Sequence, residues 1–174
     1  DALCLDMGGT SCDVCVVQDG RVQEESFGEI AGRPLALPML AVHTVGAGGG
    51  SIAWRDPGGA LRVGPMSAGA DPGPACYGRG GTEPTVTDAN LMLGRLATDA
   101  PLAGGVTLDL KAGAAAVGRL ASELDMDPIA CAEGIVRVAV AEMVRALRVV
   151  TVERGVDPRA FALLAFCLLY TSPS

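Results

Sequence analysis

The sequence predicts an α/β protein, and three observations support that prediction. Apolar runs separated by glycine-rich turns dominate the first third of the chain, which is typical of strands and hairpins. Apolar residues recur at spacings of three and four in the last third, which is typical of amphipathic helices. The 174 residues are 49% hydrophobic and 19% charged, so the chain can build one domain core or part of a larger one.

The first 84 residues predict short strands joined by turns and loops. Asp19-Gly20 is a strong hairpin signal, and a second turn, Asp-Pro-Gly-Gly, occupies residues 56–59. Residues 31–40 contain two prolines and predict a loop. Residues 65–84 are rich in glycine and proline without periodicity, and a segment of that length inside a domain favours a functional loop. The predicted strands are three within residues 2–27, then 42–45, 51–55 and 60–63.

Two shorter helices and a last strand are predicted in the remainder of the chain. Asp88 is expected to cap a short helix that runs through Leu96. Residues 112–124 are rich in alanine and predict a second helix. Residues 161–166 are almost wholly apolar and predict a buried strand.

A long helix is predicted between the second helix and the last strand. Asp127 and Pro128 form an N-cap followed by proline in the first turn, and Gly155 is the expected stop, more than 25 residues later. Glu133 and Arg137, four residues apart, are expected on its polar face. The apolar stripe expected to face the core consists of Ile129, Val136, Val140, Met143, Leu147 and Val150.

The charge balance excludes some partners. The chain has 13 basic and 20 acidic residues, a net charge of −7, and no cluster of Lys and Arg. Such a surface repels a polyphosphate backbone, so nucleic acid is not an expected partner. No apolar run approaches the roughly 20 residues that span a bilayer, so no membrane association is expected.

Cysteine usage indicates a reducing compartment. Six cysteines are present, and Cys12 and Cys15 form a C-x-x-C. The pair lies inside a predicted strand, where residues three apart point to opposite faces, so it does not suit a metal or redox site. We therefore expect buried thiols in a cytoplasmic protein.

The segment "DMGGTS" (residues 6–11) is the first candidate site. A strand that ends in Asp6, followed by Gly8, Gly9 and Thr10, lets backbone N–H groups and hydroxyls approach an anion closely. Asp6 could also hold Mg²⁺, usually through water. A plain glycine turn remains the alternative at this point.

The segment "HTVGAGGGS" (residues 43–51) is the second candidate. Ser51 stands where a dinucleotide-binding loop has its third glycine, and a strand follows rather than a helix. Close approach to a ligand explains the glycines better than a Rossmann turn. His43, the only histidine, is either a structural residue or a catalytic one.

The segment "GPMSAGADPGPACYGRGGTEPTVTDAN" (residues 64–90) is the third candidate. Loops of this kind are costly to order and often carry function. Asp71 is either a turn former or a functional carboxylate, and Asp88 is either a helix cap or a ligand-facing group. Arg79 is the cation suited to an anionic or carbonyl-bearing substrate, with Tyr77 nearby.

Taken together, four segments resemble the hydantoinase A / 5-oxoprolinase family, which includes the β subunits of acetone-type carboxylases. They are "DMGGTSCDV", "HTVGAGGGSIAW", "GPMSAGADPGPACYGRGGTEPTVTDANLMLGRL" and "ERGVDPRAFALLAF", and they follow the family order. The long third segment is the most specific.

The resemblance implies an actin-like ATPase (ribonuclease H-like) fold, mainly its second lobe, with a mixed sheet and flanking helices. "DMGGTS" would then be the second of two facing phosphate loops, and the implied cofactors are ATP and Mg²⁺. The candidate catalytic residues are Asp6, His43, Asp71 and Asp88, with Asp6 also the candidate metal ligand. The candidate cofactor-binding residues are Gly8, Gly9, Thr10, Ser11, Gly48, Gly49 and Gly50, and the candidate substrate contacts are Tyr77 and Arg79.

The family's activity implies ATP-dependent opening of a cyclic amide, such as a hydantoin, N-methylhydantoin or 5-oxoproline. Phosphorylation of the amide oxygen would activate the ring for attack by water. An acetone-type carboxylase β subunit is the alternative, and a sugar-kinase-like or activator ATPase is a second. The implied partners are the small substrate, a hydantoinase B-like subunit and further copies of the protein in an oligomer.

The sequence departs from the family pattern at two places. Cys12 stands where relatives commonly have threonine, which removes a hydroxyl beside the predicted phosphate loop. After residue 166, relatives continue into a glycine-rich adenosine-binding stretch, whereas this chain reads "CLLYTSPS". We expect residues 1–166 to form a partial domain, residues 167–174 to be a non-native tail, and the chain alone to be inactive.

Overall fold

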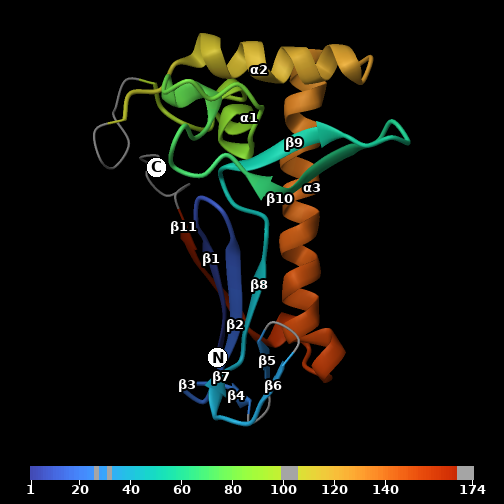
Figure 1. Ribbon diagram of the computed structural model, residues 1–174. Coiled ribbons are helices and arrows are strands. Elements are labelled where there is room, and N and C mark those ends of the chain that lie inside the picture. Colours follow the sequence, from blue (N-terminus) through green and yellow to red (C-terminus); the bar gives the residue numbers. More distant parts are fainter. Residues whose placement is uncertain (26–27, 31–32, 99–105, 168–174) are drawn as a thin grey trace.

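The computed structural model describes residues 1–25, 28–30, 33–98 and 106–167, and it shows a mixed α/β fold (Figure 1). Strand β1 (Ala2–Met7) pairs antiparallel with β2 (Cys12–Gln18). On its other side, β1 pairs in parallel with β11 (Ala162–Cys167). Strand β2 also pairs antiparallel with β3 (Arg21–Val22), which confirms the hairpin predicted at Asp19-Gly20. With β8 (Val42–Val45), which pairs with β2 as well, five strands form one mixed sheet.

Four short strands form two small pairs, which lie below the five-stranded sheet in the view of Figure 1. Strand β4 (Glu24–Glu25) pairs with β7 (Met39–Leu40), and β5 (Gly28–Ile30) pairs with β6 (Arg33–Leu35). The predicted loop at residues 31–40 is therefore partly wrong, because short antiparallel pairs satisfy some of its backbone groups. Residues 26, 27, 31 and 32 lie outside the described part.

The second predicted hairpin is confirmed, although it is longer than expected. Strand β9 (Ser51–Arg55) pairs with β10 (Leu61–Ser67), and the register shifts between Val63 and Ser67. This irregularity accommodates Gly64 and Pro65 within the strand. Trp54 Nε1 donates a hydrogen bond of 2.8 Å to the Gly64 carbonyl, across the irregular stretch.

Three helices complete the fold: α1 (Val86–Met92), α2 (Leu110–Glu123) and α3 (Pro128–Val150). Asp127 caps α3 as predicted, since its side chain accepts from the backbone N–H groups of Ile129 and Ala130. The helix has 23 residues rather than more than 25, and a 3₁₀ turn follows it up to Gly155. The cap of α1 differs from the prediction: Thr85 is the N-cap, and Asp88 is the third residue of the helix.

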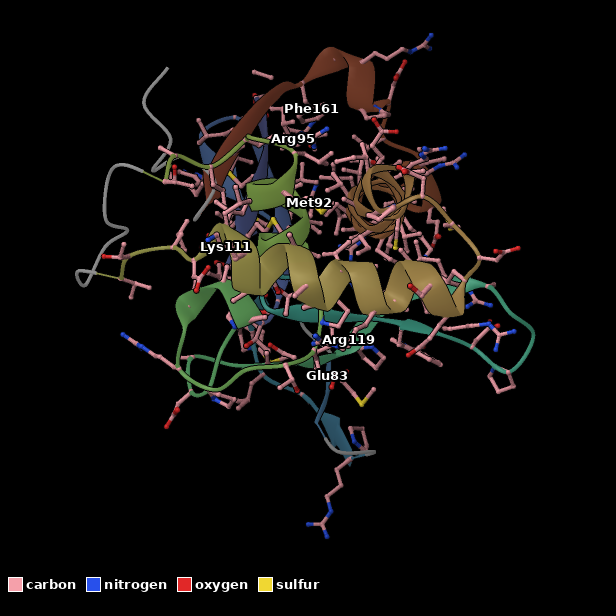
Figure 2. All side chains as sticks on the ribbon, turned by 90° about the horizontal axis from the view of Figure 1, so that it is seen from above. Glu83, Met92, Arg95, Lys111, Arg119 and Phe161 are labelled. Carbon is pink, nitrogen blue, oxygen red and sulfur yellow. The ribbon has the colours of Figure 1, made fainter. Side chains whose placement is uncertain are left out.

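The core lies between the sheet and α3, which runs along the sheet in Figure 1 and is seen end-on in Figure 2. On the sheet it uses residues of one strand face, such as Leu3, Val14 and Val16. The predicted apolar stripe of α3 was partly wrong, because Ile129 and Val140 are 47% and 49% exposed. Small side chains allow the helix to approach the sheet closely, and its buried face consists of Cys131, Ala132, Ile135, Ala139, Ala146 and Val150.

Strand β11 is present as predicted, but it is not buried. Leu163, Leu164 and Phe166 are 59%, 48% and 54% exposed. Among the described residues β11 pairs only with β1, so it forms an edge of the sheet. Burial of an apolar strand depends on neighbours at its edge and on both faces, and the described chain supplies only part of them.

Within the described residues, no helix combines the length and hydropathy that crossing a membrane requires.

Candidate functional site

The loop between β1 and β2, residues 8–11, presents backbone donors at the end of the sheet. The Gly8 N–H donates to the Ser11 carbonyl at 2.9 Å, which closes the turn. The next three N–H groups, those of Gly9, Thr10 and Ser11, have no hydrogen-bond partner among the described residues. Gly9 and Thr10 are exposed. Successive free N–H groups on a glycine-rich turn are a typical anion-binding arrangement.

The glycine cluster at residues 46–50 lies behind this loop. The N–H groups of Gly49 and Gly50 donate to the carbonyls of Gly8 and Gly9, the first at 3.0 Å. A Cβ atom on Gly48 would lie 2.6 Å from backbone atoms of Thr10, closer than any real Cβ contact. Residues 47–50 are buried. The predicted cofactor-binding glycines therefore support the loop backbone from behind, and they do so because they lack side chains.

Ser67, at the end of β10, touches the loop; it lies in the third candidate segment but was not among the predicted site residues. Its hydroxyl oxygen lies 3.2 Å from Thr10 Oγ1 and accepts a 3.1 Å hydrogen bond from the Gly69 N–H. The Ala68 N–H donates to the Gly50 carbonyl at 2.8 Å. No local sequence pattern signals a contact between residues 57 positions apart.

Asp6 and Asp13 form a pair of carboxylates at the same end of the sheet. They stand opposite each other in the β1–β2 register, on the sheet face that points away from α3. Asp6 is exposed, and the hydroxyl of Thr44 donates to Asp13. Within the described part, no group of three or more His, Cys, Asp or Glu residues could hold a metal ion. Two carboxylates suit Mg²⁺, which keeps several waters and also takes phosphate oxygens as ligands.

Asp88 is enclosed in the protein and fully buried. Its carboxylate accepts from the Thr85 N–H at 2.9 Å, the Thr85 hydroxyl at 2.7 Å and the Cys76 N–H at 2.8 Å, with the Ala75 N–H at 3.3 Å. These donors come from the start of α1 and from a 3₁₀ turn (η1, Ala75–Tyr77). Asp88 therefore joins the long glycine- and proline-rich loop to the helix that follows it. Burial, and secondarily Asp88, raises the pKa of the Cys76 thiol.

The remaining candidates of that loop are Asp71, Tyr77 and Arg79. Asp71 is exposed, in a turn that the Gly73 N–H closes onto the Ala68 carbonyl at 3.2 Å. Tyr77 is half-buried against a small apolar cluster that includes Leu91, and burial raises its pKa while Arg79 opposes that shift. Among the described residues, no hydrogen bond or ion pair joins Asp71, Tyr77 or Arg79 to residues 8–11.

His43 faces a different part of the molecule. It stands opposite the buried Val14 in the β2–β8 register, and so on the α3 side of the sheet. There it lines a groove of about 560 Å³ with Trp54, Arg62 and residues of α3. Arg62 is paired with Asp56 at 2.9 Å. The structure does not bring His43 to the β1–β2 loop.

A smaller groove of about 210 Å³ lies between α2 and residues 82–84. Arg119 of α2 donates to the Thr82 carbonyl across it. Figure 2 shows Arg119 and Glu83 near each other on one side of α2. The Arg119 guanidinium thus connects the end of the long loop to α2 through a hydrogen bond.

The C-x-x-C residues point to opposite faces, as predicted. Cys12 is buried on the α3 side, whereas Cys15 is on the other face, opposite Cys4 in the register. Burial, with a contribution from the neighbouring Cys4 thiol, raises the pKa of Cys15.

Two solved structures are similar to this fold. The structure of ATP-dependent caprolactamase from Pseudomonas jessenii matches with a TM-score of 0.86 and 46% sequence identity, over 94% of this chain and 24% of that one. The nucleotide-free structure of acetone carboxylase, an enzyme of ATP-dependent acetone carboxylation, matches with a TM-score of 0.84 and 31% identity, over 93% and 23%. The fold is therefore the mixed α/β fold that these two enzymes share.

The chain belongs to the hydantoinase/oxoprolinase family, whose pattern matches residues 1–167. The α subunit of the P. jessenii caprolactamase is 46% identical over 165 residues, and 5-oxoprolinase from Saccharomyces cerevisiae is 54% identical over 93 residues. These matches cover 94% and 53% of this chain, but only 24% and 7% of those proteins. The chain thus spans about a quarter or less of the length of these relatives.

Proposed function

We propose that this chain forms one side of the nucleotide site of an ATP-dependent enzyme that opens a cyclic amide. The observation that carries the proposal is the row of three N–H groups at Gly9, Thr10 and Ser11, without partners among the described residues, on an exposed glycine turn. These donors would bind phosphate oxygens of ATP, with the Thr10 hydroxyl beside them. In this proposal the domain is the second lobe of an actin-like ATPase, predicted over residues 1–166. Cys167 would belong to it as well, because it is the last residue of β11 and pairs with Met7.

ATP would supply the phosphoryl group that converts the amide oxygen into a leaving group, so that water can open the ring. The chain's own contribution is electrostatic and positional. Asp6, with Asp13 opposite it, would hold a Mg²⁺ ion through water near the loop. Gly48 and Gly50 would keep the loop backbone in place, and Asp88 would hold the neighbouring loop rather than act in the chemistry.

The substrate contacts are a separate part of the proposal. Arg79 is exposed and Tyr77 half-buried on the long loop, and both would face a substrate brought by the rest of the protein. The enzyme would work in the cytoplasm in an assembly with a hydantoinase B-like subunit. The caprolactamase relative is itself named as a subunit, which supports an assembly of this kind.

A carboxylase function is the second candidate. The TM-scores of 0.86 and 0.84 do not separate the two enzyme classes. The sequence identity of 46% with the caprolactamase against 31% with the acetone carboxylase favours the cyclic-amide reaction.

The test uses the complete protein that contains this chain, with its partner subunit. ADP release is measured with 5-oxoproline, hydantoin, caprolactam, or acetone with bicarbonate. We expect stimulation by a cyclic amide, and a loss of about 100-fold in turnover for Asp6→Asn, because a charge that holds Mg²⁺ is removed. Asp19→Asn, in the exposed turn after β2, is the matched control and should leave turnover unchanged.

Two outcomes would contradict the proposal. Stimulation by acetone with bicarbonate alone would move the protein to the carboxylase class. Turnover by the isolated 174-residue chain would contradict the role of a second lobe.

A further inference from the structure

Thr10, at the exposed turn of the β1–β2 loop, is in contact with a second hydroxyl. Thr10 Oγ1 lies 3.2 Å from Ser67 Oγ, and the Gly69 N–H donates to Ser67 Oγ at 3.1 Å. A chain of three polar groups therefore runs from a backbone amide on the long loop to the turn that we propose binds phosphate.

The chemistry of these groups determines the direction of the hydrogen bonds when an anion is bound. An ionised phosphate oxygen only accepts, so Thr10 must donate its single hydroxyl proton to it. Thr10 Oγ1 can then only accept from Ser67. Ser67 has lone pairs for the Gly69 N–H and one proton to give, so each group in the chain has a partner.

The residues around Ser67 hold it in place beside Thr10, and a glycine at position 50 is needed for the close approach. Gly50 lies against Ser67: a Cβ atom at that position would be 3.1 Å from Ser67 Oγ and 2.9 Å from the Gly9 carbonyl. The Ala68 N–H is held by the Gly50 carbonyl at 2.8 Å, which fixes the backbone on one side of Ser67. Ser67 is half-buried, whereas Thr10 is exposed and open to a ligand.

We infer that Ser67 is a positioning residue for the nucleotide phosphates, acting through Thr10. Gly69 N–H, Ser67 O–H and Thr10 O–H form a relay in which each donor points toward the anion. Aligned hydrogen bonds polarise one another, so the relay strengthens the last donor as well as orienting it. This inference rests on the proposed function, because it needs a phosphate at residues 8–11.

The test is a double-mutant cycle on the complete protein, read out as the dissociation constant of a non-hydrolysable ATP analogue by calorimetry. We expect Thr10→Ala to weaken binding about tenfold and Ser67→Ala about fivefold, the range of one hydrogen bond each. The double variant should bind no more weakly than Thr10→Ala alone, because Ser67 acts only through the Thr10 hydroxyl. In a Thr10→Ser background, which keeps the hydroxyl, Ser67→Ala should again weaken binding about fivefold.

Ser122→Ala is the matched control. That serine also makes a hydroxyl hydrogen bond, of 2.9 Å to the Gly118 carbonyl on α2, and its loss should not change the affinity. If Ser67→Ala weakens binding equally with and without the Thr10 hydroxyl, Ser67 acts through the fold and the relay is overturned. If Thr10→Ala weakens binding and Ser67→Ala does not, the relay is again overturned while the phosphate loop stands. If neither does, the proposed function itself fails.

Discussion

Two glycine-rich segments of this protein look alike in sequence and differ in what their glycines do. In residues 46–50, Cβ atoms on Gly48 and Gly50 would lie 2.6 and 2.9 Å from backbone atoms of the β1–β2 loop. In residues 78–80, Gly78 and Gly80 have nothing within 4 Å of such a Cβ, but their φ angles are +66° and +94°. The first segment needs glycine for close packing, whereas the second needs it for a left-handed backbone.

The two segments therefore differ in role: residues 46–50 support the β1–β2 loop, whereas the glycines at residues 78–80 shape their own turn. Residues 46–50 contact the β1–β2 loop on one side and β10 on the other, where Gly46 lies against Pro65. A change there displaces the candidate phosphate donors. Residues 78–80 are exposed, so a change of Gly78 or Gly80 is expected to leave the candidate phosphate donors in place.

The largest effect is expected from Gly48→Ala. The new methyl group would overlap backbone atoms of Gly9 and Thr10, which cannot rotate away as a side chain would. Forced overpacking costs about 1–3 kcal/mol where side chains can adjust, and more is expected here because the overlapped atoms are backbone. In the complete protein we expect a lower melting temperature and an affinity for an ATP analogue that is weaker by about tenfold or more.

Gly118→Ala is the control for this variant. Gly118 lies in α2, and the position that an alanine Cβ would take there has nothing within 4 Å, so alanine adds helix propensity without overlap. We expect a gain of up to about 1 kcal/mol and no change in affinity. If Gly48→Ala behaved in the same way as Gly118→Ala, the supporting role of residues 46–50 would be refuted.

Asp88→Asn should have the next largest effect, and it decides between two roles for that residue. The Asp88 carboxylate accepts four hydrogen bonds in the protein interior. Asparagine would keep one oxygen as an acceptor, but its NH₂ group would face the N–H and O–H groups that now donate to the carboxylate. Lost hydrogen bonds to a buried charge cost about 3 kcal/mol together. We expect a reduced melting temperature and faster amide hydrogen exchange at residues 75–76 and 85.

Asp109→Asn serves for comparison, since Asp109 caps α2 at the surface and asparagine caps nearly as well. An unchanged melting temperature with lost turnover in Asp88→Asn would assign Asp88 to the chemistry, and it would contradict its role as a structural carboxylate.

Local signals explain why most elements could be predicted. The Asp19-Gly20 turn and the Asp127-Pro128 cap each depend on a few neighbouring residues, and the structure confirms the β2–β3 hairpin and the helix. The glycines at 46–50 correctly indicated a close approach. The structure shows the backbone of the β1–β2 loop against Gly48 and Gly50, and the expected ligand contact stays a prediction.

Non-local contacts explain what could not be predicted. Ser67 meets Thr10 because β10 reaches the β1–β2 loop, and nothing in either segment specifies that approach. The buried face of α3 uses small residues such as Ala139, whereas apolar periodicity favoured larger ones such as Val140. Asp88 has cap chemistry in its sequence, but its buried partners at residues 75–76 come from the other end of a loop.

The smallest effect is expected from Gly78→Ala, and this variant sharpens the contrast with Gly48. Space for a methyl group exists, so the cost is only that of a left-handed backbone for an L-residue, about 1 kcal/mol. The melting temperature should fall slightly, and the affinity for the ATP analogue should stay within about twofold of the parent. Gly78→Asn should recover part of the loss, because asparagine tolerates this conformation better than alanine. A loss of affinity as large as that of Gly48→Ala would mean that residues 78–80 also reach the phosphate site, and the two segments would then share one role.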